Sequence, residues 1–316
     1  MSQRILERGQ IETLASRSIP RVRVPERSQV FAQRSARLRT LAQGSPIADY
    51  LRFCAVLAET QHAALGDFAA TPPTAAQLAL AHEHRMPPLA ATSWARAPQW
   101  REALSAICAA VLAQTEFPAE VTRLAARVRA ASGDALEAQA DALLGVRDGA
   151  VDVASAPFVM AALQVNWTAL SSGFAAGDVQ PLDVPGVCPL CGSLPVASLV
   201  RAQRPYQGYR YLHCTLCACE WHMVRVQCSQ CGADGKDIAY HSLTDAAAGE
   251  ANGDAAVRAE SCSRCRSYRK ILYHEKDPAL EPVADDLASL ALDLLLAEEG
   301  YERASGNPLL WTAEQG

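Results

Sequence analysis

The chain has 316 residues, of which 50% are hydrophobic and 20% charged, and its formal net charge is −5. This composition excludes a disordered protein, and the length allows two or three domains with cores of their own. Residues 184–276 carry 11 basic and 8 acidic side chains, whereas residues 277–316 carry one arginine and 9 acids. The dense basic stripe typical of nucleic-acid-binding proteins is therefore missing from the charge pattern.

The N-terminal sequence MSQRILERGQIE lacks the apolar stretch of a secretory signal peptide. The longest apolar windows, near residues 110 and 290, are too short or too charged to cross a bilayer, which takes about 20 helical residues. We therefore expect a cytoplasmic protein. In that reducing compartment, closely spaced cysteines favour metal or redox sites over structural disulfides.

Residues 1–183 are predicted to form an all-helical domain, because apolar residues recur at helical spacing from about residue 25 to 175. Gly44, Ser45 and Pro46 illustrate the boundaries: they suit a helix end, the cap of the next helix and its first turn. A break is expected at MPPL, residues 86–89. The predicted helices cover residues 26–43, 46–65, 93–115, 118–131, 134–147 and 156–174.

From residue 184 the pattern changes to short segments rich in β-branched and aromatic residues, which indicate strands. These predicted strands are residues 194–200, 209–214, 220–228, 237–243 and 268–275. The stretch TDAAAGEANGDAA, residues 244–256, is predicted to be a flexible loop.

A single helix is expected from Pro282 to Gly300, followed by an acidic tail. Leucines on roughly opposite sides predict a helix that packs on two sides or offers one face to a partner. One stripe contains Val283, Leu287, Leu290 and Leu294, and the other contains Leu292 and Leu296.

Eight of the 11 cysteines form four C-x-x-C pairs: Cys188 and Cys191, Cys214 and Cys217, Cys228 and Cys231, and Cys262 and Cys265. Such a turn suits a tetrahedral metal, since two thiolates approach one ion from a single tight turn. A thioredoxin-like redox pair would need a βαβ setting, which the strand-rich surroundings do not offer.

The order of the pairs favours two successive units. Cys191 and Cys231 are each followed by glycine, Gly192 and Gly232, which takes the positive φ that closes such a turn. The alternation of glycine-closed and plain turns predicts one site made by the first two pairs and another made by the last two. A nested arrangement, which joins the pairs across the short segment between Cys217 and Cys228, remains an alternative.

Four thiolates suit both zinc and a rubredoxin-like mononuclear iron, so the ligand set leaves the ion open. Such metals either only stabilise a small β module or transfer electrons. Cys54 and Cys108 are expected to be buried small hydrophobes, and Cys219 an unliganded strand cysteine. His213 and His222 are expected to be hydrogen-bonded or solvated rather than metal ligands.

The sequence contains no nucleophile elbow, phosphate-binding loop, dinucleotide fingerprint or H-E-x-x-H motif. The histidines of HEHRM, residues 82–86, are two apart and do not share a helical face. Fully ligated four-cysteine sites leave no coordination position for a substrate. We therefore expect a protein that is not an enzyme and has no catalytic residue.

Four segments together resemble the FdhE family of formate dehydrogenase accessory proteins. The resemblance is dense from Cys188 to Leu310 and looser in the helical half, where it rests on HEHRMPPLA and APFVMAALQVNWTAL. The segments are CPLCGSLPVASLV, RYLHCTLCACEWHMVRVQCSQCG, AESCSRCRSYRKILYHEKDP and VADDLASLALDLLLAEEGYERASGNPLL.

The resemblance implies a multidomain α+β fold, with an all-helical N-terminal domain, two small rubredoxin-like or zinc-ribbon β modules and a C-terminal helix. The corresponding divisions are residues 1–183, 184–223, 224–276 and 277–316. It further implies a cytoplasmic maturation factor that binds the molybdenum-containing catalytic subunit of respiratory formate dehydrogenase before export. The eight paired cysteines would be the ligands of two metal ions, with iron the family expectation and zinc a common substitute.

Two other functions remain open from the residues alone. An iron redox protein would donate electrons to a cofactor of its client. A zinc-ribbon protein that binds nucleic acid would show salt-dependent binding, which the charge balance disfavours. Membrane insertion is not expected, and the sequence leaves the oligomeric state open.

Overall fold

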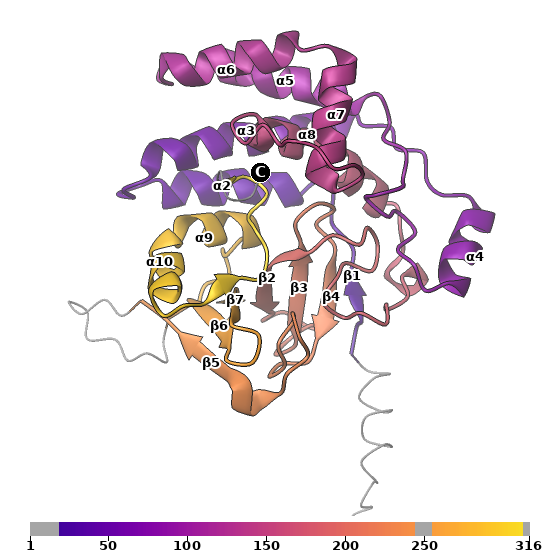
Figure 1. Ribbon diagram of the computed structural model, residues 1–316, viewed down its shortest axis with the longest axis vertical. Coiled ribbons are helices and arrows are strands. Elements are labelled where there is room, and N and C mark those ends of the chain that lie inside the picture. Colours follow the sequence, from indigo (N-terminus) through magenta and orange to yellow (C-terminus); the bar gives the residue numbers. More distant parts are fainter. Residues whose placement is uncertain (1–18, 244–254, 312–316) are drawn as a thin grey trace, which may run out of the picture.

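The computed structural model, which describes residues 19–243 and 255–311, stacks a helical layer on one mixed β-sheet (Figure 1). Helices α5 and α6 lie farthest from the sheet, and α4 stands apart at one side. Within the described residues the helices are α2 (Val30–Leu41), α3 (Ala48–Gly66), α4 (Ala75–Glu83), α5 (Trp100–Leu112), α6 (Ala119–Ala130), α7 (Gly133–Leu144), α8 (Ala156–Ser171), α9 (Pro282–Ala288) and α10 (Leu290–Glu298).

The two cysteine-rich segments, residues 184–223 and 224–276, contribute strands to the same sheet. Its strand order is β1-β4-β3-β2-β7-β6-β5, with β8 paired to β7. Strands β2 and β7 run parallel at its centre and join the two halves, with Leu199 opposite Leu272. The strands are β1 (Val22–Arg23), β2 (Pro195–Val200), β3 (Arg210–Cys214), β4 (Glu220–Met223), β5 (Ile238–His241), β6 (Val257–Cys262), β7 (Ser267–Tyr273) and β8 (Glu302–Arg303).

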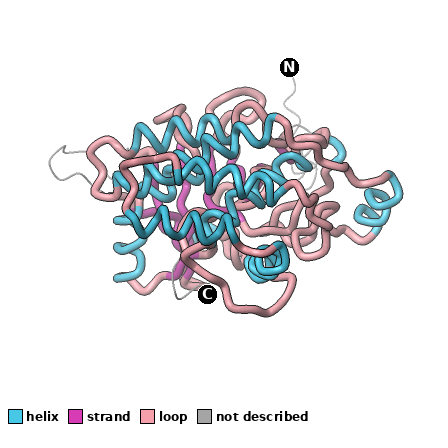
Figure 2. Tube along the Cα trace, turned by 90° about the horizontal axis from the view of Figure 1, so that it is seen from above, coloured by secondary structure: helices cyan, strands magenta, loops and turns pink. Residues whose placement is uncertain are grey.

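Helix α8 lies at the centre of the molecule, and all of its residues from Ala156 to Ser171 are buried. It packs against α3, α5 and α7, and the view from above shows the helices lying over the strands (Figure 2). Helix α9 contacts both α2 and β2 and so connects the C-terminal segment to both layers. No helix in the described ranges is long and apolar enough to cross a membrane.

The helical half differs from the prediction at two helices. Helix α5 begins at Trp100 instead of residue 93, because Pro98 disfavours helical geometry in the residue before it. Helix α4 was not predicted, although its capping box is visible in the sequence: Thr74 accepts from the Gln77 backbone, and the Gln77 side chain accepts from the Thr74 backbone. The short strand β1 is a further exception to an all-helical N-terminal region.

The helix expected over 282–300 divides in two at Ser289, which has φ −105° and ψ 38°. The buried Lys270 ammonium donates to the Asp286 carbonyl at 2.6 Å, which is the acceptor that a continuous helix would offer to Leu290. The break lets α9 bury its apolar stripe in the main core while α10 packs separately on β6 and β7. In the first predicted stripe Val283 and Leu287 are buried, Leu290 is half-buried and Leu294 is exposed. In the second stripe both Leu292 and Leu296 are buried, so packing on two sides is confirmed for the four buried residues.

Strand β4 is shorter than predicted, since residues 224–227 form a turn, and strand β6 was not predicted. Most of the predicted loop 244–256 lies outside the described residues. The remaining predicted strands correspond to β2, β3, β5 and β7, and each end agrees to within two residues.

Candidate metal centres

The paired cysteines meet in two groups of four in the described residues. The first group joins the turn before β2 to the β3–β4 turn, and the second joins the turn before β5 to the β6–β7 turn. In each group the four sulfur atoms lie within 4.8 Å of one another. The first group is Cys188, Cys191, Cys214 and Cys217, and the second is Cys228, Cys231, Cys262 and Cys265. The geometry therefore brings the pairs together in succession, and the nested arrangement is not formed.

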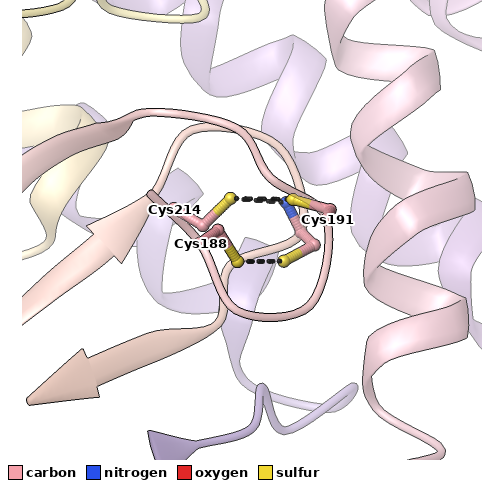
Figure 3. Close-up of side chains that lie close together, drawn as sticks. Cys188, Cys191 and Cys214 are labelled. Atoms are coloured by element: carbon pink, nitrogen blue, oxygen red, sulfur yellow. Dashed lines mark hydrogen bonds between the residues drawn. The ribbon is translucent and has the colours of Figure 1, made fainter. Parts of the chain in front are cut away.

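The sulfur spacing fits one tetrahedral ion in each group. In the first group the Cys191 and Cys214 sulfurs lie 3.4 Å apart (Figure 3), and the Cys188 and Cys217 sulfurs 3.5 Å apart. Both corresponding distances in the second group are 3.7 Å. Thiolates about 2.3 Å from one metal stand about 3.8 Å apart at tetrahedral corners, whereas a disulfide would bring two sulfurs to about 2.05 Å.

All four turns share one backbone geometry. The residue after each second cysteine has a positive φ, at Gly192, Ala218, Gly232 and Arg266. In three of them its N–H donates to the carbonyl of the first cysteine at 2.9–3.0 Å, as from Gly192 to Cys188. The glycine positions were predicted correctly. The left-handed conformation at Ala218 and Arg266 was not, because an L side chain there is strained.

At Arg266 the strain is offset by contacts of its own side chain. The guanidinium lies 4.0 Å from the centre of the Tyr301 ring and donates to the Gly300 carbonyl at 3.1 Å. Cation–π contacts and hydrogen bonds of this kind each contribute on the order of 1 kcal/mol.

Sulfur chemistry in the first group supports a cation. Burial raises the pKa of the Cys188, Cys214 and Cys217 thiols well above the usual range, and their mutual hydrogen bonds adjust the values further. Burial also opposes ionisation of Cys191, but the three neighbouring thiols donate to its sulfur and bring its pKa well below the usual range. Burial thus disfavours thiolates at three of the four positions, and a cation bound between the sulfurs would favour them.

Backbone donors support the sulfurs further. The N–H groups of Leu216 and Cys217 point at the Cys214 sulfur at 3.3 and 3.4 Å. In the second group the N–H of Gln230 lies 3.4 Å from the Cys228 sulfur. Such donors orient metal-bound thiolates and moderate their charge.

Helix α8 supports the first group in a way that sequence reasoning missed. Ser171 donates to the Cys217 carbonyl at 2.8 Å, and Gln164 donates to the Thr215 carbonyl at 2.6 Å. The visible signal was a set of polar residues inside an apolar helical run, because polar groups on a buried helix need partners.

Buried arginines connect the two cysteine-rich segments. Arg210 is fully buried, donates to Glu260 at 2.8 Å and also donates to the Gln227 carbonyl at 2.9 Å. Arg269 donates to the Ser229 hydroxyl at 2.9 Å and to the Pro195 carbonyl. Each arginine therefore contacts both segments, and neither was singled out from the sequence.

The other cysteines lie outside the two groups. Cys54 and Cys108 are buried among helices, as predicted, and burial raises the pKa of Cys108 to about 12. Cys219 is buried beside the first group, and its thiol donates to the Glu220 carbonyl at 3.8 Å.

The two histidines near the first group take part in polar and ring contacts. His213 is hydrogen-bonded to the Glu220 carboxylate at 3.3 Å. His222 lies against the Tyr209 and Tyr211 rings.

Comparison with known proteins gives the same family for each part of the chain. Family models described as FdhE N-terminal, FdhE central domain and FdhE C-terminal domain match residues 19–183, 187–225 and 226–310. The chain is 39% identical over 320 residues to a protein FdhE homolog of Cronobacter sakazakii and to protein FdhE of Salmonella paratyphi A, with 99% of each chain covered. The crystal structure of FdhE from Pseudomonas aeruginosa is 40% identical, with a TM-score of 0.80 over 94% of this chain and 100% of that one. The chain is therefore a member of the FdhE family.

Proposed function

We propose that this protein is a cytoplasmic maturation factor for respiratory formate dehydrogenase, and that it binds the molybdenum-containing catalytic subunit of that enzyme. The resemblance to formate dehydrogenase accessory proteins names the client. The observation that carries the proposal is the pair of four-cysteine groups, each with the spacing of a closed tetrahedral site. A closed shell of this kind suits a binding or electron-transfer protein rather than a metalloenzyme, since it leaves no position for a substrate.

The eight cysteines of the two groups are the proposed metal ligands, and the proposed ion is iron, with zinc as a substitute. A four-thiolate iron would supply a one-electron couple, whereas zinc would only stabilise the fold. We keep the division of the chain at residues 183, 223 and 276 as part of this proposal.

The client is tested by co-purification with the catalytic subunit and by activation of formate dehydrogenase in cells that lack the native factor. The variant replaces Cys188 and Cys191 with serine, and the matched control is Cys219→Ser, which changes a neighbouring buried thiol outside the group. We expect the double variant to lose activation and the control to keep it. Full activation by the double variant would exclude a required role for the first site.

Metal analysis of protein purified without oxygen separates the two ions. Ferric-thiolate absorption bands with a reversible potential would support the electron-transfer function. Bound zinc in freshly isolated protein would exclude electron transfer at these sites.

A further inference from the structure

The two four-cysteine groups differ in their access to solvent. Every cysteine of the first group is at most 1% exposed. In the second group Cys231 is exposed and Cys265 is half-buried, while the other two are buried. The same ligand chemistry therefore occurs once inside the molecule and once at its surface.

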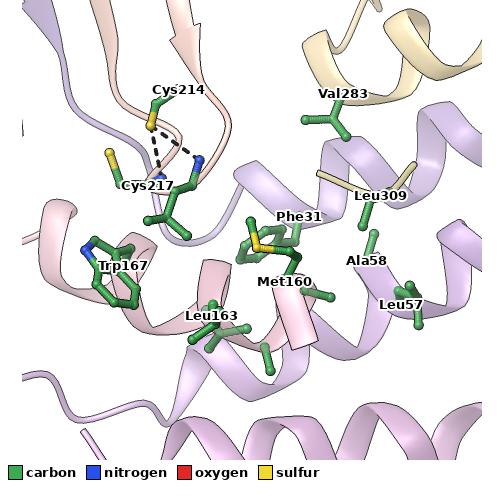
Figure 4. Close-up of a cluster of buried hydrophobic side chains, with 14 of the residues drawn as sticks. Phe31, Leu57, Ala58, Met160, Leu163, Trp167, Cys214, Cys217, Val283 and Leu309 are labelled. Carbon is green, nitrogen blue, oxygen red and sulfur yellow. Dashed lines mark hydrogen bonds between the residues drawn. The ribbon is translucent and has the colours of Figure 1, made fainter. Parts of the chain in front are cut away.

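The first group is part of the main hydrophobic core, together with side chains from the helical layer. Figure 4 shows Cys214 and Cys217 beside the helices that carry Trp167 and Phe31. The loop before α5 closes the other side of the group, since Ala91 donates its N–H to the Cys191 carbonyl at 2.9 Å. Because none of these four cysteines is more than 1% exposed, an incoming ligand reaches their sulfurs only if part of the surrounding core opens.

The second group forms a small hydrophobic cluster separate from that core. Its buried members are Cys228, Ala233 and Cys262, with Ile238 and Cys265 packed against them. Exposed polar residues surround the open side, among them Gln230, Ser263 and Arg264. Movement of these two turns would leave the main core intact.

Release of a metal from a four-thiolate site needs an incoming ligand at the ion or at a sulfur, so the rate depends on how often the site opens. Local openings cost far less free energy than global unfolding, and buried sites in a cooperative core open close to the global limit. The structure therefore predicts two different rates of exchange within one chain.

We infer that the second group is an exchange site, where a metal ion enters and leaves the folded protein through the side lined by Cys231 and Cys265. The first group holds its ion for as long as the main core around it stays closed. The inference rests on metal binding at both groups, which belongs to the proposed function, but it requires no client.

The experiment uses the full chain loaded with two equivalents of zinc under reducing, oxygen-free conditions. An excess of a colorimetric chelator reports release. We expect two phases of equal amplitude whose rates differ by on the order of tenfold or more.

Two variants assign the phases, because Cys191 and Cys231 occupy equivalent positions in their turns. Cys231→Ser is expected to abolish the fast phase, leave one bound zinc and retain the near-ultraviolet circular dichroism of the fold. Cys191→Ser is expected to keep the fast phase and lose the slow one.

If Cys191→Ser does not fold, the phases can be assigned in the protein without substitutions. Cysteines are alkylated with iodoacetamide during zinc release and identified by peptide mass spectrometry. Cysteines of the second group should be labelled first. A single release rate for both ions, a fast phase that survives Cys231→Ser, or earlier labelling of the first group would overturn the inference. A failure to load any zinc would instead contradict the proposed metal-binding function.

Discussion

Replacement of the glycine that closes a C-x-x-C turn should destabilise the protein by an amount that follows from the backbone geometry of that turn. Gly192 and Gly232 have φ of +76° and +74°, so alanine at either position adopts a left-handed conformation that costs about 1–2 kcal/mol. Reduced flexibility of the unfolded chain returns about 0.4–1 kcal/mol. The net loss at Gly232 is about 1 kcal/mol, since an added Cβ there meets no atom closer than 3.9 Å.

At Gly192 the added Cβ would lie 3.3 Å from Cγ of Pro87. Pro87 belongs to the loop that is hydrogen-bonded to this turn, because Leu89 donates to the Leu190 carbonyl at 2.8 Å. Tight packing adds about 1 kcal/mol, for a total of about 2 kcal/mol. We expect these losses in the free energy of unfolding of the zinc-loaded protein, about 1 kcal/mol for Gly232→Ala and about 2 kcal/mol for Gly192→Ala.

Urea unfolding of the zinc-loaded protein measures both effects. Ala218→Gly is the control of opposite sign, because it removes the strain of a positive φ of 57° at a turn that has no glycine. Relief of about 1–2 kcal/mol of strain is offset by about 0.4–1 kcal/mol from the more flexible unfolded chain, so we expect the free energy of unfolding to stay the same or to rise by up to about 1 kcal/mol. The reasoning would be refuted by a greater loss for Gly232→Ala than for Gly192→Ala, or by unchanged stability in both.

Three further predictions concern the polar groups around the sites. Arg210→Met leaves Glu260 buried without its arginine, with the Tyr240 hydroxyl still donating to it, and should lower the free energy of unfolding by about 3–5 kcal/mol. A change in thermal midpoint no larger than for a surface arginine variant would contradict this. Burial and the neighbouring Arg201 lower the pKa of His274 to about 4 in the folded protein. Below about pH 6.5 the unfolded chain therefore binds a proton that the folded protein does not bind. The free energy of unfolding should fall by up to about 3 kcal/mol as the pH drops from about 7 to about 4. His274→Gln should therefore flatten the decline of the thermal midpoint with acidification, and parallel profiles for variant and parent would argue against the assignment. Ser171→Ala removes a hydrogen bond to a turn of the first site and should cost about 1 kcal/mol in urea unfolding, whereas Ser172→Ala, which loses only a bond within its own helix, serves as the comparison and should cost less.

Local chemistry explains which parts of the site could be predicted. The C-x-x-C spacing brings two sulfurs onto one turn whatever the rest of the chain does, and glycine after Cys191 and Cys231 marks a positive φ directly. Ala218 and Arg266 give no such mark, because closure of the turn, rather than residue preference, imposes their conformation.

The features that were missed depend on residues far apart in the chain. The helix break at Ser289 arises because Lys270 takes the Asp286 carbonyl, and the sequence shows only an uninterrupted helical pattern there. The polar side chains of α8 are hydrogen-bonded to the β3–β4 turn, which lies more than 40 residues along the chain, so their role does not follow from the helix sequence. Tertiary contacts of this kind override local propensity.

The parallel pairing of β2 with β7 has a consequence for biosynthesis. Strand β2 ends at Val200 and its neighbour begins at Ser267, so the centre of the sheet stays open until the ribosome has released most of the chain. Helix α2 lacks a buried ion-pair partner for still longer, because Arg34 pairs at 3.0 Å with Glu281, which is synthesised after β7. A metal bound early at Cys188 and Cys191 would therefore have to be retained by a nascent chain whose protective layers are not yet assembled.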